Sequence, residues 1–204
     1  MRVEYYFSVN SPYVYIGSAR VAQMAGQVGA GWRYKPLHFS ALAARMGSLV
    51  MVDADPARKA YFAQDLARQA SKAGLPMLDA PPFYPANSAP ASYAIIAAQA
   101  AADKGAAGDL HGLVFGICRA VWGEGRDIAD ADVIASIMAG SGFDPAIADR
   151  GMFMAADEYA RNVEDALAAG VFGTPFIVAG AAKFWGQDRL EDAAQHLGLQ
   201  LAAS

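Results

Sequence analysis

The sequence predicts an α/β fold in which a small sheet is interrupted by a long all-helical insertion, and three regions carry this prediction. Roughly the first forty residues read as strand, helix and strand, and roughly the last thirty as two short strands and a helix. Between them, residues 41–170 show helical spacing and no strand signal. We therefore expect one discontinuous α/β domain made of residues 1–40 and 171–204, with an inserted helical subdomain over residues 41–170.

The N-terminal region has the order of a βαβ unit. Residues 2–7 are rich in Val, Tyr and Phe and predict a strand, which the polar residues 8–11 end as a turn. Ser11 and Pro12 have the form of a helix start, a hydroxyl cap followed by proline at the first helical position. Residues 32–37 predict a second strand, and a βαβ connection makes it parallel to the first.

Further helices are expected in the middle of the chain, followed by two strands and a closing helix. The middle helices are expected over residues 56–73, 89–103, 110–122, 128–138 and 155–169, with a proline-rich loop between the first two. Residues 174–178 and 183–185 are short apolar runs separated by a turn at Gly180, which is typical of a hairpin. Residues 188–197 return to helical spacing and are expected to close the fold.

Composition and charge exclude several classes of protein. The 204 residues are 55% hydrophobic and 18% charged, which is enough apolar material for a sizeable core. The net charge is −4 and no long run of Lys or Arg is present, so nucleic acid is not an expected partner. No stretch of about 18 apolar residues is free of charges or breakers, and the N-terminus lacks the pattern of a secretory signal. We therefore expect no membrane span and a cytoplasmic protein.

The chain is poor in metal-binding and redox side chains. Its one cysteine, Cys118, excludes an internal disulfide, and its apolar helical surroundings predict an inert core residue. The three histidines, His38, His111 and His196, lie far apart and lack metal-ligand spacing, so no metal site is expected.

The predicted layout resembles the thioredoxin fold, and two landmarks of that fold can be located. Ser11-Pro12-Tyr13 stands where thioredoxin-like proteins carry a cysteine pair at the start of the first helix. Without that pair the protein itself cannot exchange thiol for disulfide. Thr174-Pro175 is placed to supply the cis-proline that faces this helix start in such proteins.

The position of Ser11 indicates a chemistry for its hydroxyl. A helix start presents free N–H groups and the positive end of the helix dipole, which stabilises a nearby anion by about 0.3–2 kcal/mol. A thiol of ordinary pKa, about 8.5, would become largely ionised near neutrality with this help and a hydrogen bond from a hydroxyl. The thiol must then come from a ligand, and glutathione is the abundant intracellular choice. The alternative is that Ser11 only caps the helix.

Four motifs together resemble the 2-hydroxychromene-2-carboxylate isomerase family, relatives of the kappa-class glutathione transferases within the DsbA-type thioredoxin fold. They are Ser11-Pro12-Tyr13 after the first strand, Val121-Trp122-Gly123-Glu124-Gly125, the run from Gly170 to Pro175, and the run from Phe184 to Leu190. The motifs lie in the order of the family and cover nearly the whole chain. The resemblance implies a thioredoxin-like domain with an inserted helical subdomain, and a homodimer.

The resemblance also implies roles for individual residues around glutathione. Ser11 would hold the thiolate, and Thr174 and Pro175 would pair with the cysteine backbone of the ligand as an added strand does. Gln187 and Asp188 would hold the γ-glutamyl end. Without the resemblance, the sequence is equally consistent with Asp188 acting only as the cap of the last helix.

The chain departs from the family at the glycyl end of glutathione. Family members commonly carry Gly-Asn before the helix at residue 56, where this chain has Gly47 and Ser48, and a common lysine is replaced by Arg58 or shifted to Lys59. Ser48 and Arg58 are therefore the candidate contacts there.

An aromatic substrate pocket is expected from Phe83 and Tyr84 of the proline-rich loop together with Trp122. The sequence is equally consistent with these three residues packing in the hydrophobic core.

The resemblance implies a glutathione-dependent cis–trans isomerase that interconverts 2-hydroxychromene-2-carboxylate and trans-o-hydroxybenzylidenepyruvate, a step of naphthalene-type aromatic catabolism. Two alternatives stay open. A kappa-type transferase would conjugate glutathione to a small electrophile at the same thiolate, and a non-catalytic protein would bind glutathione without turnover.

Overall fold

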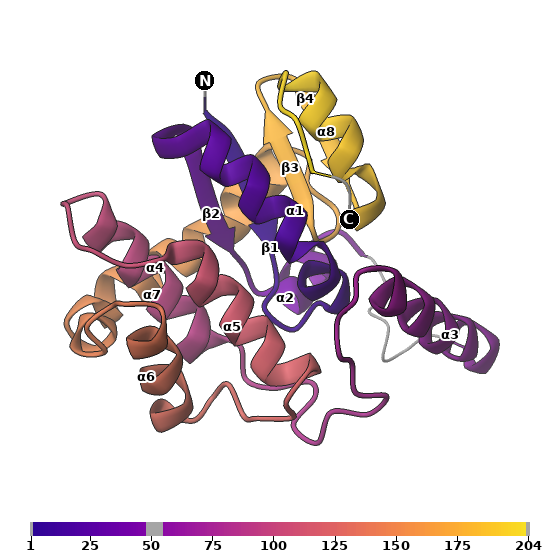
Figure 1. Ribbon diagram of the computed structural model, residues 1–204, viewed down its shortest axis with the longest axis horizontal. Coiled ribbons are helices and arrows are strands. Elements are labelled where there is room, and N and C mark those ends of the chain that lie inside the picture. The colour runs from indigo at the N-terminus through magenta and orange to yellow at the C-terminus, as the bar shows by residue number, and fades with distance from the viewer. Residues whose placement is uncertain (1, 48–54, 203–204) are drawn as a thin grey trace.

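The computed structural model describes residues 2–47 and 55–202, which form one four-stranded sheet surrounded by helices (Figure 1). The strands are β1 Val3–Phe7, β2 Trp32–Pro36, β3 Phe176–Ala179 and β4 Ala182–Trp185. The helices are α1 Pro12–Val28, α2 Phe39–Arg45, α3 Pro56–Lys72, α4 Ala89–Ala102, α5 Leu110–Trp122, α6 Ala131–Gly140, α7 Ala146–Ala168 and α8 Leu190–His196, with 3₁₀ turns η1 at Gly29–Gly31 and η3 at Gln187–Arg189. None of the helices in the described segments is long and apolar enough to cross a membrane.

The sheet joins the two ends of the chain. Its strand order is β2-β1-β3-β4, with β1 parallel to β2 and antiparallel to β3, and with β3 antiparallel to β4. The expected βαβ unit and terminal hairpin are therefore confirmed, and β1 lies at the centre because it pairs with both.

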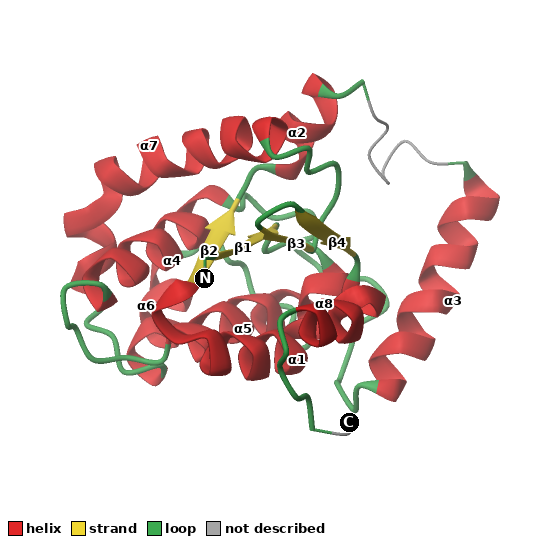
Figure 2. Cartoon of the chain, turned by 90° about the horizontal axis from the view of Figure 1, so that it is seen from above, coloured by secondary structure: helices red, strands yellow, loops and turns green. Residues whose placement is uncertain are grey.

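Both faces of the sheet are buried, as the side chains of β1 show by pointing alternately to one face and to the other. Tyr5 and Phe7 point to one side, into the core that α1, α5 and α8 cover, while Tyr6 points to the other side, into the core of α2 and α7. Figure 2 shows α2 and α7 above the sheet and α1, α5 and α8 below it. A sheet covered on both faces explains why its central strand is apolar at nearly every position.

The helical insertion packs beside β2 and returns over the sheet. Helices α4 and α7 form its most extensive contact, and they approach so closely that a Cβ on Gly151 would lie 2.7 Å from the Cβ of Ala97. Helix α3 stands on the opposite side of the molecule from α4 and α6 (Figures 1 and 2). The predicted fold class, α/β with a helical insertion, is confirmed, and no strand lies within residues 41–47 or 55–170. The domain limits 1–40, 41–170 and 171–204 stay a prediction.

One helix was not predicted, and three others begin at different residues from those expected. The sequence did not predict α2, which has only seven residues and begins at Phe39. The helix expected from residue 128 begins at Ala131, because the Asp130 carboxylate accepts hydrogen bonds from the N–H groups of Asp132 and Val133 and so caps it there.

The last two helices of the chain are also shifted. Helix α7 begins at Ala146 rather than at residue 155, since the helical Gly151 is held by its contact with α4. The closing helix begins at Leu190 rather than at residue 188, because the 3₁₀ turn Gln187–Arg189 precedes it.

Candidate active site

Ser11 opens α1 with its side chain uncommitted. Its backbone is extended, with φ −79° and ψ 122°, and its C=O accepts from the N–H groups of Val14 and Tyr15 at 3.1 and 3.3 Å. Its hydroxyl makes no capping hydrogen bond, and the residue is half-buried. The reading of Ser11 as a side-chain cap is therefore wrong for this structure, and the hydroxyl is available to a ligand at the positive end of α1.

The Thr174–Pro175 peptide is cis, as the sequence predicts. In the antiparallel pairing of β1 with β3, Tyr6 lies opposite Phe176. The cis peptide directly precedes Phe176, at the end of the sheet from which β1 leads towards Ser11. Its proline C=O accepts from the Gly186 N–H at 2.9 Å, which ties this loop to the residues that precede Gln187.

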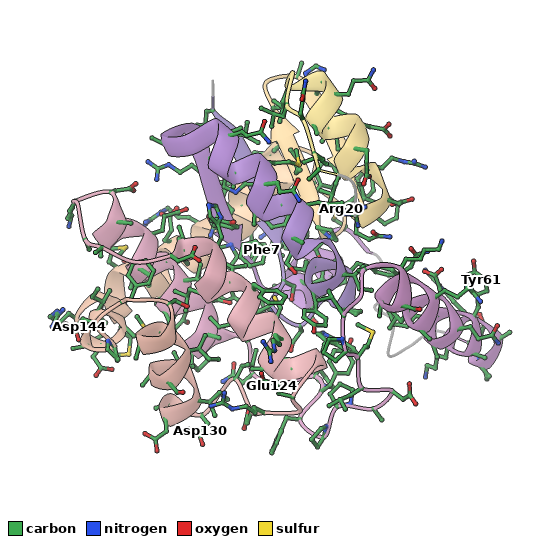
Figure 3. The ribbon with its side chains drawn as sticks, in the orientation of Figure 1. Phe7, Arg20, Tyr61, Glu124, Asp130 and Asp144 are labelled. Atoms are coloured by element: carbon green, nitrogen blue, oxygen red, sulfur yellow. The ribbon has the colours of Figure 1, made fainter. Side chains whose placement is uncertain are left out.

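Gln187 is buried and its amide has a fixed orientation. Its Oε1 accepts a hydrogen bond from the Arg20 guanidinium, so its NH₂ group faces away and lies 3.5 Å from Oε1 of Gln69. Figure 3 labels Arg20 where α1 meets the η3–α8 segment. The neighbouring Asp188 is exposed, with the Arg189 guanidinium 3.8 Å from its carboxylate. A buried amide donor and an exposed carboxylate thus stand side by side at the start of η3.

Tyr13 connects α1 to α3 and was not singled out from the sequence. Its hydroxyl donates to the Asp65 carboxylate at 2.6 Å, and its ring meets Phe62 edge-on at 5.7 Å. Burial and the bond to Asp65 raise the pKa of the Tyr13 hydroxyl well above its ordinary value, so it stays protonated and donates. The first turn of α1, next to Ser11, is therefore tied to α3 by a hydrogen bond between residues 52 positions apart in the sequence.

Of the two residues expected at the glycyl end of glutathione, the structure describes Arg58. Arg58 is exposed in the first turn of α3, where its backbone N–H is held by the Asp55 carboxylate at 3.0 Å. Ser48 lies outside the described residues, so the contact expected of it stays a prediction.

The three aromatic residues expected to line a substrate pocket are found in two different settings. Trp122 is buried, and its indole N–H donates to the Asn10 C=O at 3.2 Å. Tyr84 covers it with ring centroids 4.8 Å apart, and both Phe83 and Tyr84 are substantially exposed, at 48% and 41%. The loop therefore presents the aromatic surface, while Trp122 supports it from the core.

Asn10 fastens this loop to the start of α1 and was missed from the sequence. Its amide nitrogen donates to the Ala86 C=O at 2.8 Å. Its Oδ1 is buried without a hydrogen-bond partner among the described residues. An Asn directly before a helix cap reads as ordinary turn chemistry, so no local signal could have identified it.

Comparison with known proteins identifies the family. The DSBA-like thioredoxin domain family matches residues 2–198. The chain belongs to this family. A curated relative, the 2-hydroxychromene-2-carboxylate isomerase of Pseudomonas putida, is 28% identical over 93% of this chain and 91% of its own length. The enzyme of that name from Pseudomonas sp. strain C18 is also 28% identical, over 92% of this chain and 86% of its own length.

Solved structures show the same likeness. A solved 2-hydroxychromene-2-carboxylate isomerase superposes with a TM-score of 0.77 at 26% identity, over 97% of this chain and 95% of the other. The cytosolic disulfide reductase DsbM of Pseudomonas aeruginosa, solved with GSH, shares the fold with a TM-score of 0.64 at 17% identity, over 98% of this chain and all of its own. The resemblance to the isomerase family expected from the sequence is confirmed.

This DSBA-like domain has no reactive thiol of its own in its described part. Cys118 is fully buried in α5, and burial raises the pKa of its thiol to about 12. The thiol is therefore neutral and shielded at physiological pH, as the sequence predicts. No group of three metal-binding side chains occurs among the described residues.

Alanine substitutions at two glycines of α1 in this DSBA-like domain are expected to have opposite effects on stability. A Cβ on Gly17 would lie 3.0 Å from Cδ1 of Leu190 and 3.3 Å from Cβ of Gln187, so Gly17 lets η3 approach α1. Gly17→Ala is expected to lower the free energy of unfolding by about 1 kcal/mol through overpacking against Gln187 and Leu190. Chemical denaturation measures this effect.

The matched control is Gly26→Ala. Nothing lies within 4 Å of a Cβ at Gly26, so this substitution is expected to raise the free energy of unfolding by about 0.5–1 kcal/mol through helix propensity alone. Equal effects of the two substitutions would show that the contact of Gly17 with η3 does not constrain the site.

Proposed function

We propose that this protein is a glutathione-dependent isomerase that interconverts 2-hydroxychromene-2-carboxylate and trans-o-hydroxybenzylidenepyruvate, or a close analogue. The relatives that carry this name match nearly the whole length of the chain. The single observation that carries the proposal is the Ser11 hydroxyl, which stands at the N-terminus of α1 and caps nothing.

In this proposal Ser11 donates a hydrogen bond to the glutathione thiolate. The N-terminus of α1 adds dipolar stabilisation of about 0.3–2 kcal/mol. The Tyr13 hydroxyl does not compete for the sulfur, because it is committed to Asp65. Both contributions favour the ionised thiol, so a larger fraction of the bound ligand is nucleophilic near neutrality.

The rest of the glutathione molecule would follow the loop and the start of η3. The backbone of Thr174 would pair with the cysteine of the ligand as an added strand. The amide NH₂ of Gln187 would donate to the γ-glutamyl carboxylate, and the exposed Asp188 carboxylate would accept from the γ-glutamyl ammonium group. Arg58 would reach the glycyl carboxylate.

The reaction needs no net oxidation and consumes no glutathione. The thiolate sulfur adds to the benzylic carbon of the conjugated double bond, and the electron pair of that bond moves through the chain of carbons to the keto oxygen as an enolate. The former double bond is now single and rotates. The enolate then re-forms the double bond in the cis geometry and expels the thiolate. The phenol oxygen adds to the ketone carbon while its proton passes to the keto oxygen, which closes the chromene ring as a hemiketal. The aromatic ring would lie against Phe83 and Tyr84 throughout.

A thiol balance tests the function. Purified protein is mixed with glutathione and trans-o-hydroxybenzylidenepyruvate, and both the absorbance of the conjugated ketone and the free thiol are followed. We expect an approach to equilibrium that requires glutathione while the free thiol stays constant. A thiol concentration that falls with the absorbance would instead indicate conjugation by a kappa-type transferase. Calorimetric binding of glutathione without turnover would indicate a non-catalytic binding protein.

A further inference from the structure

Thr174 carries a backbone donor and acceptor that the protein itself does not use. Its N–H and C=O make no hydrogen bond with any residue that the structure describes. Thr174 is half-buried, while Gly173 and Pro175 on either side of it are buried. Partly buried backbone groups of this kind require a partner. In the proposed function that partner is the cysteine of glutathione, so the residues that hold Thr174 in place influence how well the ligand pairs with it.

The end of β4 holds both neighbours of Thr174. The Gly186 N–H donates to the Pro175 C=O at 2.9 Å. On the other side, Trp185 covers Gly173 so closely that a Cβ on this glycine would lie 2.2 Å from the indole Nε1 and 2.7 Å from Cε2. Trp185 is the last residue of β4, which is the edge strand farthest from β2 (Figure 2). The loop is therefore held before and after Thr174 by two consecutive residues.

Gly173 is required by the Trp185 indole and not by its own backbone conformation. Its φ lies outside the left-handed region that favours glycine, so the backbone would accept an alanine there. The three atoms nearest to a Cβ at this position all belong to the indole. Phe172 adds a second contact, because its ring meets the indole edge-on with centroids 4.9 Å apart. Trp185 is 53% exposed, so it contributes little to the buried core and packs chiefly on this loop.

We propose that Trp185 is a positioning residue for glutathione, because it holds the Thr174 backbone ready to pair with the cysteine of the ligand. This rests on the proposed function, in which Thr174 forms that pairing. A loop that is already ordered loses less conformational freedom when the ligand binds. Fixing the backbone of one residue costs on the order of a tenfold change in affinity. Trp185 would thus strengthen glutathione binding without a contact of its own to the ligand.

The test compares two ligands by calorimetry in the wild type and in Trp185→Ala. We expect the variant to bind glutathione about tenfold more weakly, with little change in its free energy of unfolding. Trp185→Phe keeps a flat ring over Gly173 and should recover most of the affinity. The second ligand is a glutathione analogue in which an ester oxygen replaces the cysteine N–H, so it cannot donate to the Thr174 C=O. Because part of the pairing is already lost, Trp185→Ala should weaken this ligand at least about threefold less than it weakens glutathione.

Gly173→Ala examines the same contact from the side of the loop. Its Cβ must displace the indole, so we expect glutathione to bind about tenfold more weakly. In the Trp185→Ala background the atoms that the Cβ would meet are gone, and the same substitution should cost less than about twofold. The control is Phe153→Ala on α7, where an aromatic side chain that is 82% exposed is removed and the affinity should not change.

Three results would overturn the role of Trp185: an unchanged affinity for glutathione in Trp185→Ala, equal weakening of both ligands, or additive effects of the substitutions at Gly173 and Trp185. If Trp185→Ala does not fold, Gly173→Ala with the two ligands decides in the same way. A wild type that binds no glutathione would overturn this inference together with the proposed function. A protein that shows the expected binding pattern but does not isomerise the keto acid would overturn the proposed function and leave this inference standing.

Discussion

Ser11→Ala is expected to slow glutathione-dependent isomerisation by about 10–100-fold, because a hydrogen bond to a charged group contributes about 1.5–3 kcal/mol. The hydroxyl makes no capping bond, so its removal should leave the stability of α1 nearly unchanged. Loss of the hydroxyl should also raise the pKa of the bound thiol by about one unit, which corresponds to about 1.4 kcal/mol. The low-pH limb of kcat against pH should therefore shift upward by that amount, and steady-state kinetics with saturating glutathione measure both effects.

Two further variants isolate the hydroxyl. Ser11→Thr keeps it at the same position and is expected to recover most of the rate. Ser18→Ala makes the same chemical change about two turns further along α1, where the hydroxyl bonds only the Tyr15 C=O, and should leave the rate unchanged. An unshifted pH limb in Ser11→Ala would mean that the thiolate lies elsewhere.

The fold was predictable because its main elements carry strong local signals. The dense Val, Tyr and Phe content of β1 and the Ser-Pro start of α1 each specify one structure, and α5 begins and ends where its spacing predicts. Helix α2 was missed because seven residues are too few for a helical period to show, and its cap, His38, is not among the preferred cap residues. Its stability comes from burying Leu42 and Ala43, which is a tertiary effect.

The candidate site was predictable only where a landmark residue stands beside a helix or strand end. Ser11 and the cis peptide at Pro175 belong to such local motifs. Tyr13 with Asp65, and Arg20 with Gln187, are pairs separated by 52 and 167 residues, so no periodicity in the sequence connects them. The role of Asn10 becomes visible only in the folded structure, where its side chain holds the loop at Ala86.

Lys35 shows a further consequence of a sheet that is covered on both faces. It lies on β2 opposite Tyr6, and only 6% of its side chain is exposed. Its ammonium group contacts the Asp165 carboxylate of α7 at 2.5 Å and lies 3.4 Å from Oδ1 of Asn162. The Asp165 side chain is itself 48% exposed, so water reaches one partner of this ion pair and hardly reaches the other.

This asymmetry predicts unequal effects of removing either charge. Asp165→Asn leaves a buried ammonium whose remaining counter-charge is the Glu4 carboxylate 4.0 Å away, and is expected to lower the free energy of unfolding by about 3 kcal/mol. Lys35→Met leaves a carboxylate that water can solvate, and is expected to lower it by only about 1–2 kcal/mol. The free energy of unfolding should fall less in the double variant than the sum of the two single losses, because neither charge of this pair is then left without its partner. Denaturant unfolding of the three variants measures these differences.

The control for this prediction is the neighbouring pair of Arg45 and Glu164, which joins α2 to α7 at 2.6 Å with both side chains more than half exposed. Exposed ion pairs contribute little, because solvent screens them and both side chains lose conformational freedom. Arg45→Met is therefore expected to leave stability unchanged within error. The contrary result would be that Lys35→Met lowers the free energy of unfolding as much as Asp165→Asn does. That result would mean that the stabilisation comes from the contact itself and that solvation of the remaining partner is not the deciding factor.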